Sequence, residues 1–136
     1  GAAPVILIGA GAGVAPLAGF VRGNARRRPM WLYFGARHPE SDFLYRQELE
    51  AALGDRRLSA LRPTFSRWRE RRRVQSALAA DEETLRALAA RGAQILVCGG
   101  GEMARGVVDT LSGVLAPLGL SGADLKREGR YVEDVY

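Results

Sequence analysis

Residues 5–16 read VILIGAGAGVAP and join a run of four apolar residues to a glycine-rich turn. An unbroken apolar run of this length is typical of a strand buried on both faces of a sheet. The alternating glycines let the backbone turn tightly, and the helix expected next would offer free N–H groups at its N-terminus to an anion. This order of strand, glycine turn and helix indicates a parallel sheet with a ligand site at its edge.

The remaining sequence repeats this alternation of strand and helix. Further strands are expected at about 30–34, 58–65, 95–98 and 130–136, and helices at 14–21, 43–53, 73–91, 102–115 and 121–127. Pro63 suggests an edge strand or a bulge, and Asp81 suggests a break in the long helix. Parallel strands need crossover connections, so the pattern predicts an α/β fold: a five-stranded parallel sheet flanked by helices on both faces.

Length and composition favour a single folded domain over residues 1–136. The chain is 47% apolar and carries a net charge of +5, with nineteen of its twenty basic residues being arginine. One cysteine and one histidine exclude an internal disulfide and a histidine-rich metal site, so no metal is expected. The sequence shows no signal peptide and no apolar run as long as a membrane span, and we expect a cytoplasmic parent, with or without a membrane tether elsewhere.

Five arginines crowd residues 65–74, which read FSRWRERRRV. A hydroxyl beside a guanidinium, as in Ser66-Arg67, can hold a phosphate monoester through bidentate hydrogen bonds. The arginines could instead be a solvated helix start, or a basic module at 67–73 that binds nucleic acid or an acidic partner. The sequence has no helix-turn-helix, RRM or KH signature, which disfavours nucleic acid.

Two further strand ends are chemically distinctive. Cys98 precedes glycines 99–101, and a small side chain followed by glycine leaves room for a flat ring, although a lone cysteine after Ile-Leu-Val is more often a core residue. Asp134-Val135-Tyr136 ends the chain on an aromatic residue, which is either a surface side chain or a planar lid stacked on something aromatic.

In order along the chain, six segments resemble the NADP(H)-binding domain of the ferredoxin–NADP⁺ reductase family, and most closely its diflavin branch of sulfite reductase flavoprotein and cytochrome P450 reductase. The segments are GAGAGVAP (9–16), YFGARHPESDFLYRQEL (33–49), FSR (65–67), VQSAL (74–78), ILVCGG with Met103-Ala104, and GRYVEDVY (129–136). The resemblance covers essentially the whole chain. It implies that residues 1–136 are the NADP(H)-binding part of a longer flavoprotein whose FAD-binding domain precedes them.

The resemblance also implies a role for each matching residue. In the family, NADPH passes hydride to FAD, and electrons leave to FMN, haem or an iron–sulfur partner. Ser66 and Arg67, helped by an arginine from 71–73, would hold the 2′-phosphate. Cys98 would face the nicotinamide, Asp134 would steady it, and Tyr136 would stack on the flavin until nicotinamide displaces it. The remaining cofactor-binding positions are Gly11, Ala12, Gly13, Arg37, Arg71, Arg73, Gly99 and Met103.

Some positions depart from the family pattern. Ala12 stands where threonine is frequent, Gly100 where aspartate is common, and the segment from Ser66 to Gln75 is one residue short. An NADH-dependent relative is disfavoured because NADH sites usually carry a carboxylate in place of Ser66-Arg67. The isolated domain is expected to bind NADPH without holding FAD or turning over by itself.

Overall fold

In the part of the chain that the structure describes, five parallel strands form one sheet. The computed structural model describes residues 3–36, 45–65 and 73–136, and the strand order across the sheet is β3-β2-β1-β4-β5. The predicted fold class is therefore confirmed. The strands are β1 (Val5–Ala10), β2 (Met30–Ala36), β3 (Ala60–Phe65), β4 (Gln94–Gly99) and β5 (Tyr131–Val135).

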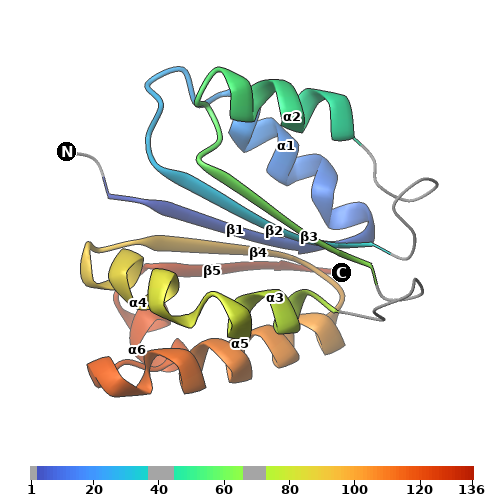
Figure 1. The fold of residues 1–136 in the computed structure, drawn as a ribbon. Coiled ribbons are helices and arrows are strands. Elements are labelled where there is room, and N and C mark those ends of the chain that lie inside the picture. The colour runs from blue at the N-terminus through green and yellow to red at the C-terminus, as the bar shows by residue number, and fades with distance from the viewer. Residues whose placement is uncertain (1–2, 37–44, 66–72) are drawn as a thin grey trace.

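Helices cover both faces of the sheet (Figure 1). One face carries α1 (Val14–Arg22) and α2 (Arg46–Gly54); the other carries α3 (Val74–Ala80), α4 (Glu82–Ala90), α5 (Gly101–Leu115) and α6 (Gly122–Arg127). Short 3₁₀ turns occupy Gly11–Gly13 and Ala116–Leu118. None of the helices in the described ranges is both long and apolar enough to cross a membrane.

Two local sequence signals match the structure. Pro63 lies in β3, which is an edge strand, as expected for a residue that cannot donate a ladder hydrogen bond. Ser121 caps α6 through a reciprocal capping box with Asp124. The structure differs slightly at β3, which begins at Ala60, because the amide of Ser59 bonds the carbonyl of Met30 before the regular ladder starts.

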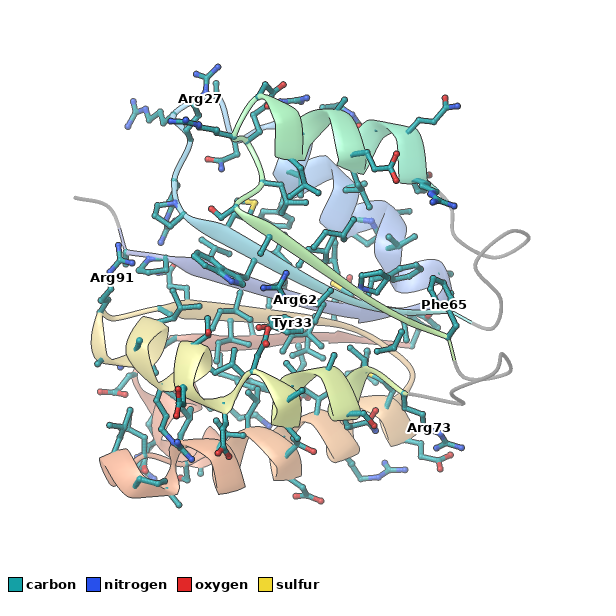
Figure 2. All side chains as sticks on the ribbon, viewed as in Figure 1. Arg27, Tyr33, Arg62, Phe65, Arg73 and Arg91 are labelled. Atoms are coloured by element: carbon teal, nitrogen blue, oxygen red, sulfur yellow. The ribbon has the colours of Figure 1, made fainter. Side chains whose placement is uncertain are left out.

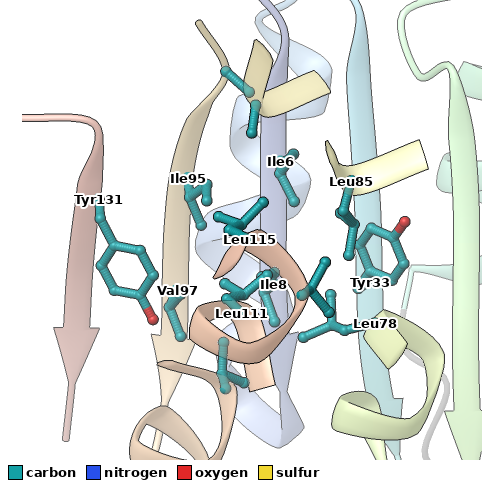
Figure 3. Close-up of a cluster of buried hydrophobic side chains, with 14 of the residues drawn as sticks. Ile6, Ile8, Tyr33, Leu78, Leu85, Ile95, Val97, Leu111, Leu115 and Tyr131 are labelled. Atoms are coloured by element: carbon teal, nitrogen blue, oxygen red, sulfur yellow. The ribbon is translucent and has the colours of Figure 1, made fainter. Parts of the chain in front are cut away.

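The central strand β1 separates two apolar clusters. Ile6 and Ile8 face the cluster beneath α3, α4, α5 and α6, whereas Val5 and Leu7 face the cluster beneath α1 and α2. Figure 3 shows the first cluster, with Tyr33 and Tyr131 at opposite sides of it. Because β1 is buried on both faces, the apolar run at 5–8 is explained by its place in the middle of the sheet.

A buried tyrosine fixes the break between α3 and α4. The Tyr33 hydroxyl donates a hydrogen bond to Asp81 Oδ2 at 2.7 Å, and Arg62 Nε lies 3.0 Å from the same oxygen. Figure 2 shows Tyr33 and Arg62 side by side on the sheet. Burial and the neighbouring carboxylate both raise the pKa of Tyr33, so it stays a hydrogen-bond donor. The predicted break at Asp81 is therefore anchored to β2 and β3.

The second buried tyrosine has no such partner. The Tyr131 side chain is 4% exposed, and its hydroxyl has no hydrogen-bond partner among the described residues. Burying a hydroxyl without a partner costs about 1–3 kcal/mol. The two tyrosines therefore form a natural comparison, since the same atom is bonded in one and orphaned in the other.

We predict opposite effects when each hydroxyl is deleted. Tyr131→Phe should leave the free energy of unfolding unchanged or raise it by up to about 1 kcal/mol, because it removes an unsatisfied polar group. Tyr33→Phe should lower it by about 1–2 kcal/mol, because it breaks a bond to a carboxylate. Urea unfolding of both variants tests this; equal losses would contradict the assignment of the two hydroxyls.

Candidate functional site

The candidate site lies where the strand order reverses, between β1 and β4. From β1 the chain passes through α1 to β2 on one side, and from β4 it passes through α5 to β5 on the other. The loops that follow β1 and β4 therefore diverge to opposite faces and leave a crevice between their first residues. The glycine turn and the Cys98-Gly99 segment, predicted separately as ligand-binding, meet at this crevice.

Gly13 packs directly against the carboxyl end of β4. A Cβ added at Gly13 would lie 2.8 Å from the carbonyl carbon of Cys98 and closer still to its oxygen. The φ angle of Gly13 is an ordinary −64°, so it is the lack of space that requires glycine here. Gly11, by contrast, has a positive φ of 57° and an open approach from solvent. The turn therefore packs on β4 at Gly13 and is open to solvent at Gly11, where a ligand could approach.

Tyr136 reaches back across the strand ends to this turn. Its amide donates to the carbonyl of Gly99 at 3.1 Å, and its hydroxyl donates to the carbonyl of Ala10 at 3.4 Å. The residue is 70% exposed, so a planar aromatic side chain lies over the crevice with one side open to solvent. The ring is thus held beside the β1 turn by one hydrogen bond, and its role as a lid stays a prediction.

Cys98 and Asp134 are register partners on β4 and β5. Cys98 is 2% exposed and belongs to the apolar cluster beneath α1 and α2, so the alternative expectation of a core cysteine is met. Burial raises the pKa of the Cys98 thiol, and the charge of Asp134 raises it further. The thiol is therefore neutral at physiological pH and offers a small, uncharged surface rather than a nucleophile.

A pocket of about 640 Å³ opens on the other face of the sheet, between α3 and α5. It is lined by residues from the ends of β1 and β2 and from the first turns of both helices: Ala10, Gly11, Gly35, Ala36, Arg73, Val74, Gln75, Glu102, Met103 and Gly106. Figure 2 places Arg73 on the side of the molecule where the strands end, the same side as Phe65 at the end of β3. A cation at the rim of a glycine-lined pocket suits a phosphate-bearing ligand.

The structure brings together most of the predicted site residues that it describes. Gly11, Arg73 and Met103 line the pocket, while Gly13, Cys98, Gly99, Asp134 and Tyr136 form the crevice beside it; Ala12 is exposed in the turn between them. The predictions for Arg37, Ser66, Arg67 and Arg71 lie outside the described residues.

Seven of the ten described residues that line the pocket are not among the predicted site residues, and three of these seven are Gln75 of α3 and Glu102 and Gly106 of α5. Gln75 packs so closely on Gly106 that a Cβ there would lie 3.3 Å from the Gln75 amide carbon, and Glu102 begins α5 beside them. The VQSAL segment contains Gln75, and its amide could have been noted as a candidate donor or acceptor. Only the packing of α3 on α5 shows that Gln75, Glu102 and Gly106 share one wall.

The model of the oxidoreductase NAD-binding domain family matches residues 7–109. The chain belongs to this family. It is 38% identical over 150 residues to human NADPH–cytochrome P450 reductase and 33% identical over 162 residues to mouse methionine synthase reductase. Each match covers 98% of this chain, but 22% and 23% of the relative. A bifunctional cytochrome P450/NADPH–P450 reductase of Bacillus cereus is 35% identical over 151 residues, with 98% of the chain and 14% of that protein covered.

These relatives confirm the predicted resemblance to the NADP(H)-binding domains of diflavin reductases of the cytochrome P450 reductase type. The link to sulfite reductase stays a prediction. This NAD-binding domain spans less than a quarter of the length of the relatives named above.

We predict that the domain does not tolerate Gly13→Ala. The added methyl group would collide with the backbone of β4, and overpacking of this kind costs about 1–3 kcal/mol. Gly19→Ala in α1 is the matched control, since nothing lies within 4 Å of its added Cβ and the helix should gain about 0.5–1 kcal/mol. Thermal unfolding of both variants measures the difference, and a Gly13→Ala protein as stable as wild type would refute the close approach.

The pH dependence of Cys98 alkylation tests its pairing with Asp134. Because the carboxylate disfavours the thiolate, Asp134→Asn should lower the thiol pKa and shift the rise of iodoacetamide labelling to lower pH. Glu133→Gln is the control, because Glu133 is the next residue of β5 and points to the opposite face. Equal shifts in both variants would mean that net charge, and not the neighbouring carboxylate, sets the thiol pKa.

Proposed function

We propose that this domain binds NADPH across the carboxyl edge of its sheet and presents the nicotinamide to FAD held mainly by a preceding domain. NADPH supplies a hydride to the flavin when both are bound. The parent would be an NADPH-dependent flavoprotein oxidoreductase that passes electrons on to FMN, haem or an iron–sulfur acceptor. The relatives support this proposal, since cytochrome P450 reductase and methionine synthase reductase are named for electron delivery and are several times longer than this chain.

The observation that carries the proposal is the meeting of three strand ends at one crevice. The β1 turn, the Cys98 end of β4 and Tyr136 after β5 lie side by side, with the exposed Tyr136 ring bonded to Ala10 and the buried Cys98 behind the turn. An exposed aromatic ring next to a glycine turn suits a ligand with a flat ring. Gly11 has room for close backbone approach by a diphosphate, so the residues present fit a dinucleotide.

Different residues of the chain would hold different parts of the cofactor. Ser66 and Arg67, as predicted from sequence, would take the 2′-phosphate, helped by Arg73 at the pocket rim or by Arg71. Arg37 would lie beside the adenosine or the pyrophosphate. Asp134 would steady the nicotinamide, and Met103 would pack beneath it beside Gly99. Tyr136 would cover the flavin until nicotinamide takes its place.

The decisive experiment compares 2′-phospho-AMP with AMP by titration calorimetry of this chain. The domain should prefer 2′-phospho-AMP, and Arg73→Ala should weaken that ligand by about 5–30-fold with little effect on AMP, because a charge-assisted bond is lost. Arg91→Ala is the control, since Arg91 lies far from Arg73 in Figure 2. Arg67→Ala should behave like Arg73→Ala.

Two results would contradict the proposal. If Arg73→Ala weakened the binding of 2′-phospho-AMP and AMP equally, Arg73 would not contact the 2′-phosphate. Absence of any preference, together with salt-sensitive binding of RNA or DNA that is lost in Arg67→Ala, would favour the alternative, in which residues 67–73 are a basic module for nucleic acid or an acidic partner. The cytoplasmic location inferred from the sequence stays a prediction.

A further inference from the structure

A second basic region lies at the amino ends of the strands, away from the proposed nucleotide site. It consists of Arg26, Arg27 and Arg28 before β2 and of Arg56 and Arg57 before β3. Figure 2 shows Arg27 and Arg73 at opposite sides of the molecule. We call these five residues, with the groove described below, the amino-end surface. The proposed function uses none of them.

One buried amide joins the two loops that carry these arginines. Asn24 is 7% exposed, and its Nδ2 donates to the carbonyls of Arg28 and Arg57 at 2.8 Å each. Its Oδ1 accepts from the amide of Arg28 at 3.0 Å. Every polar group of this side chain is thereby used inside the protein. The loops before β2 and β3, which carry the arginines, are therefore linked to each other by the Asn24 side chain.

The positive charge of the amino-end surface is only partly neutralised. Arg57 Nε lies 2.9 Å from Asp55 Oδ2, so that pair is matched. Arg27 donates to the main-chain carbonyl of Asp55 and Arg28 to that of Ala3, which orients both guanidinium groups without cancelling their charge. Among the described residues, no carboxylate forms an ion pair with Arg26, Arg27, Arg28 or Arg56.

Two of these arginines occupy backbone conformations that favour glycine. Arg27 has a φ of 54° and Arg56 a φ of 68°. Long side chains adopt this left-handed region only at a cost in stability, and glycine or asparagine would relieve it. The cost makes Arg27 and Arg56 positions at which replacement by glycine should not lower stability.

An apolar groove of about 440 Å³ adjoins the arginines. Phe20 of α1 and Val132 of β5 stand on its sides, 52% and 54% exposed, and Leu7 and Leu96 are among its lining residues. Asn24, Arg28 and Arg130 also line it, so the groove reaches the loop before β2 at Arg28. An apolar recess bordered by charge is the usual anatomy of a protein–protein interface.

We propose that the amino-end surface binds an acidic protein segment that carries an apolar anchor side chain. The anchor would fill the groove beside Phe20, and carboxylates beside it would meet Arg26, Arg28 and Arg56. Single-stranded nucleic acid is a poorer fit, because it is held by several aromatic faces, and Phe20 is the one aromatic residue among the described residues that line the groove. A lipid bilayer is a poorer fit because the apolar lining is recessed, and a membrane surface requires protruding apolar side chains.

The test is an NMR titration of the ¹⁵N-labelled chain with the peptide acetyl-Glu-Asp-Glu-Leu-Phe-Asp-Glu-Asp-amide. Asn24 is the only asparagine of the chain, so its side-chain amide gives a unique signal at the amino-end surface. We expect that signal and the amides of residues 20–28 to shift together. A Gln/Asn version of the peptide and a version with Ala-Ala in place of Leu-Phe should each bind at least about fivefold more weakly, since each removes one half of the recognition.

Variants of the chain separate this surface from general charge. Arg26→Ala/Arg56→Ala should weaken the peptide by about 5–30-fold, whereas Arg105→Ala/Arg127→Ala, which removes the same charge from α5 and α6, should not. Arg56→Gly gives a sharper readout, because it relieves the positive φ. It should keep or raise the melting temperature while weakening the peptide, which a purely structural role for Arg56 would not produce.

Several results would overturn the proposal. If the peptide shifted the NMR signals of Arg73 and Gln75 and left the Asn24 side-chain signal unchanged, the peptide would bind the other basic region. Equal losses in the two double variants would show that net charge alone attracts it. Tighter binding of an eight-residue oligouridylate, or of phosphatidylserine vesicles, through the Asn24 signal would replace the protein partner by nucleic acid or membrane. None of these depends on the 2′-phosphate preference, so this proposal and the proposed function can fail separately.

Discussion

The contact of the Gly13 backbone with the carboxyl end of β4 is the constraint on which the site depends. The turn after β1 packs directly on β4, and this contact leaves no room for a side chain at residue 13. Because β5 pairs with β4 in register, the same contact sets how far Asp134 and Tyr136 stand from the turn. A crevice this narrow is built by backbone, and the side chains around it need only be small or flat.

Much of the fold could be predicted from the sequence because its signals are local. The apolar run at 5–8 predicts a strand buried on both faces, Pro63 predicts an edge, and Asp81 predicts a break between helices. Each depends on the residue's own chemistry and its near neighbours in the chain. The parallel direction of the strands follows from the same alternation, since parallel strands need crossover connections. The order β3-β2-β1-β4-β5 does not follow from it, and the structure supplies it.

What the sequence could not supply are contacts between residues far apart in the chain. The wall of Gln75, Glu102 and Gly106 exists only because α3 packs beside α5. The carboxylate of Asp81 turns to Tyr33 and Arg62 rather than capping its own helix, and nothing in the sequence around residue 81 indicates this. The hydrogen bond from Asn24 to the carbonyl of Arg57, 33 residues away in the chain, forms only because the loops before β2 and β3 lie side by side.

The way Tyr136 is attached limits the kind of motion it can make. Its main chain is tied to Gly99, whereas its ring is held by a single long hydrogen bond to Ala10. The ring can therefore swing away by rotation about its own side-chain bonds while β5 stays in register. Exposed side chains rotate within about a nanosecond, many orders of magnitude faster than most enzyme turnover. Movement of this ring would then act as a rapid equilibrium before chemistry, and not as a slow gate.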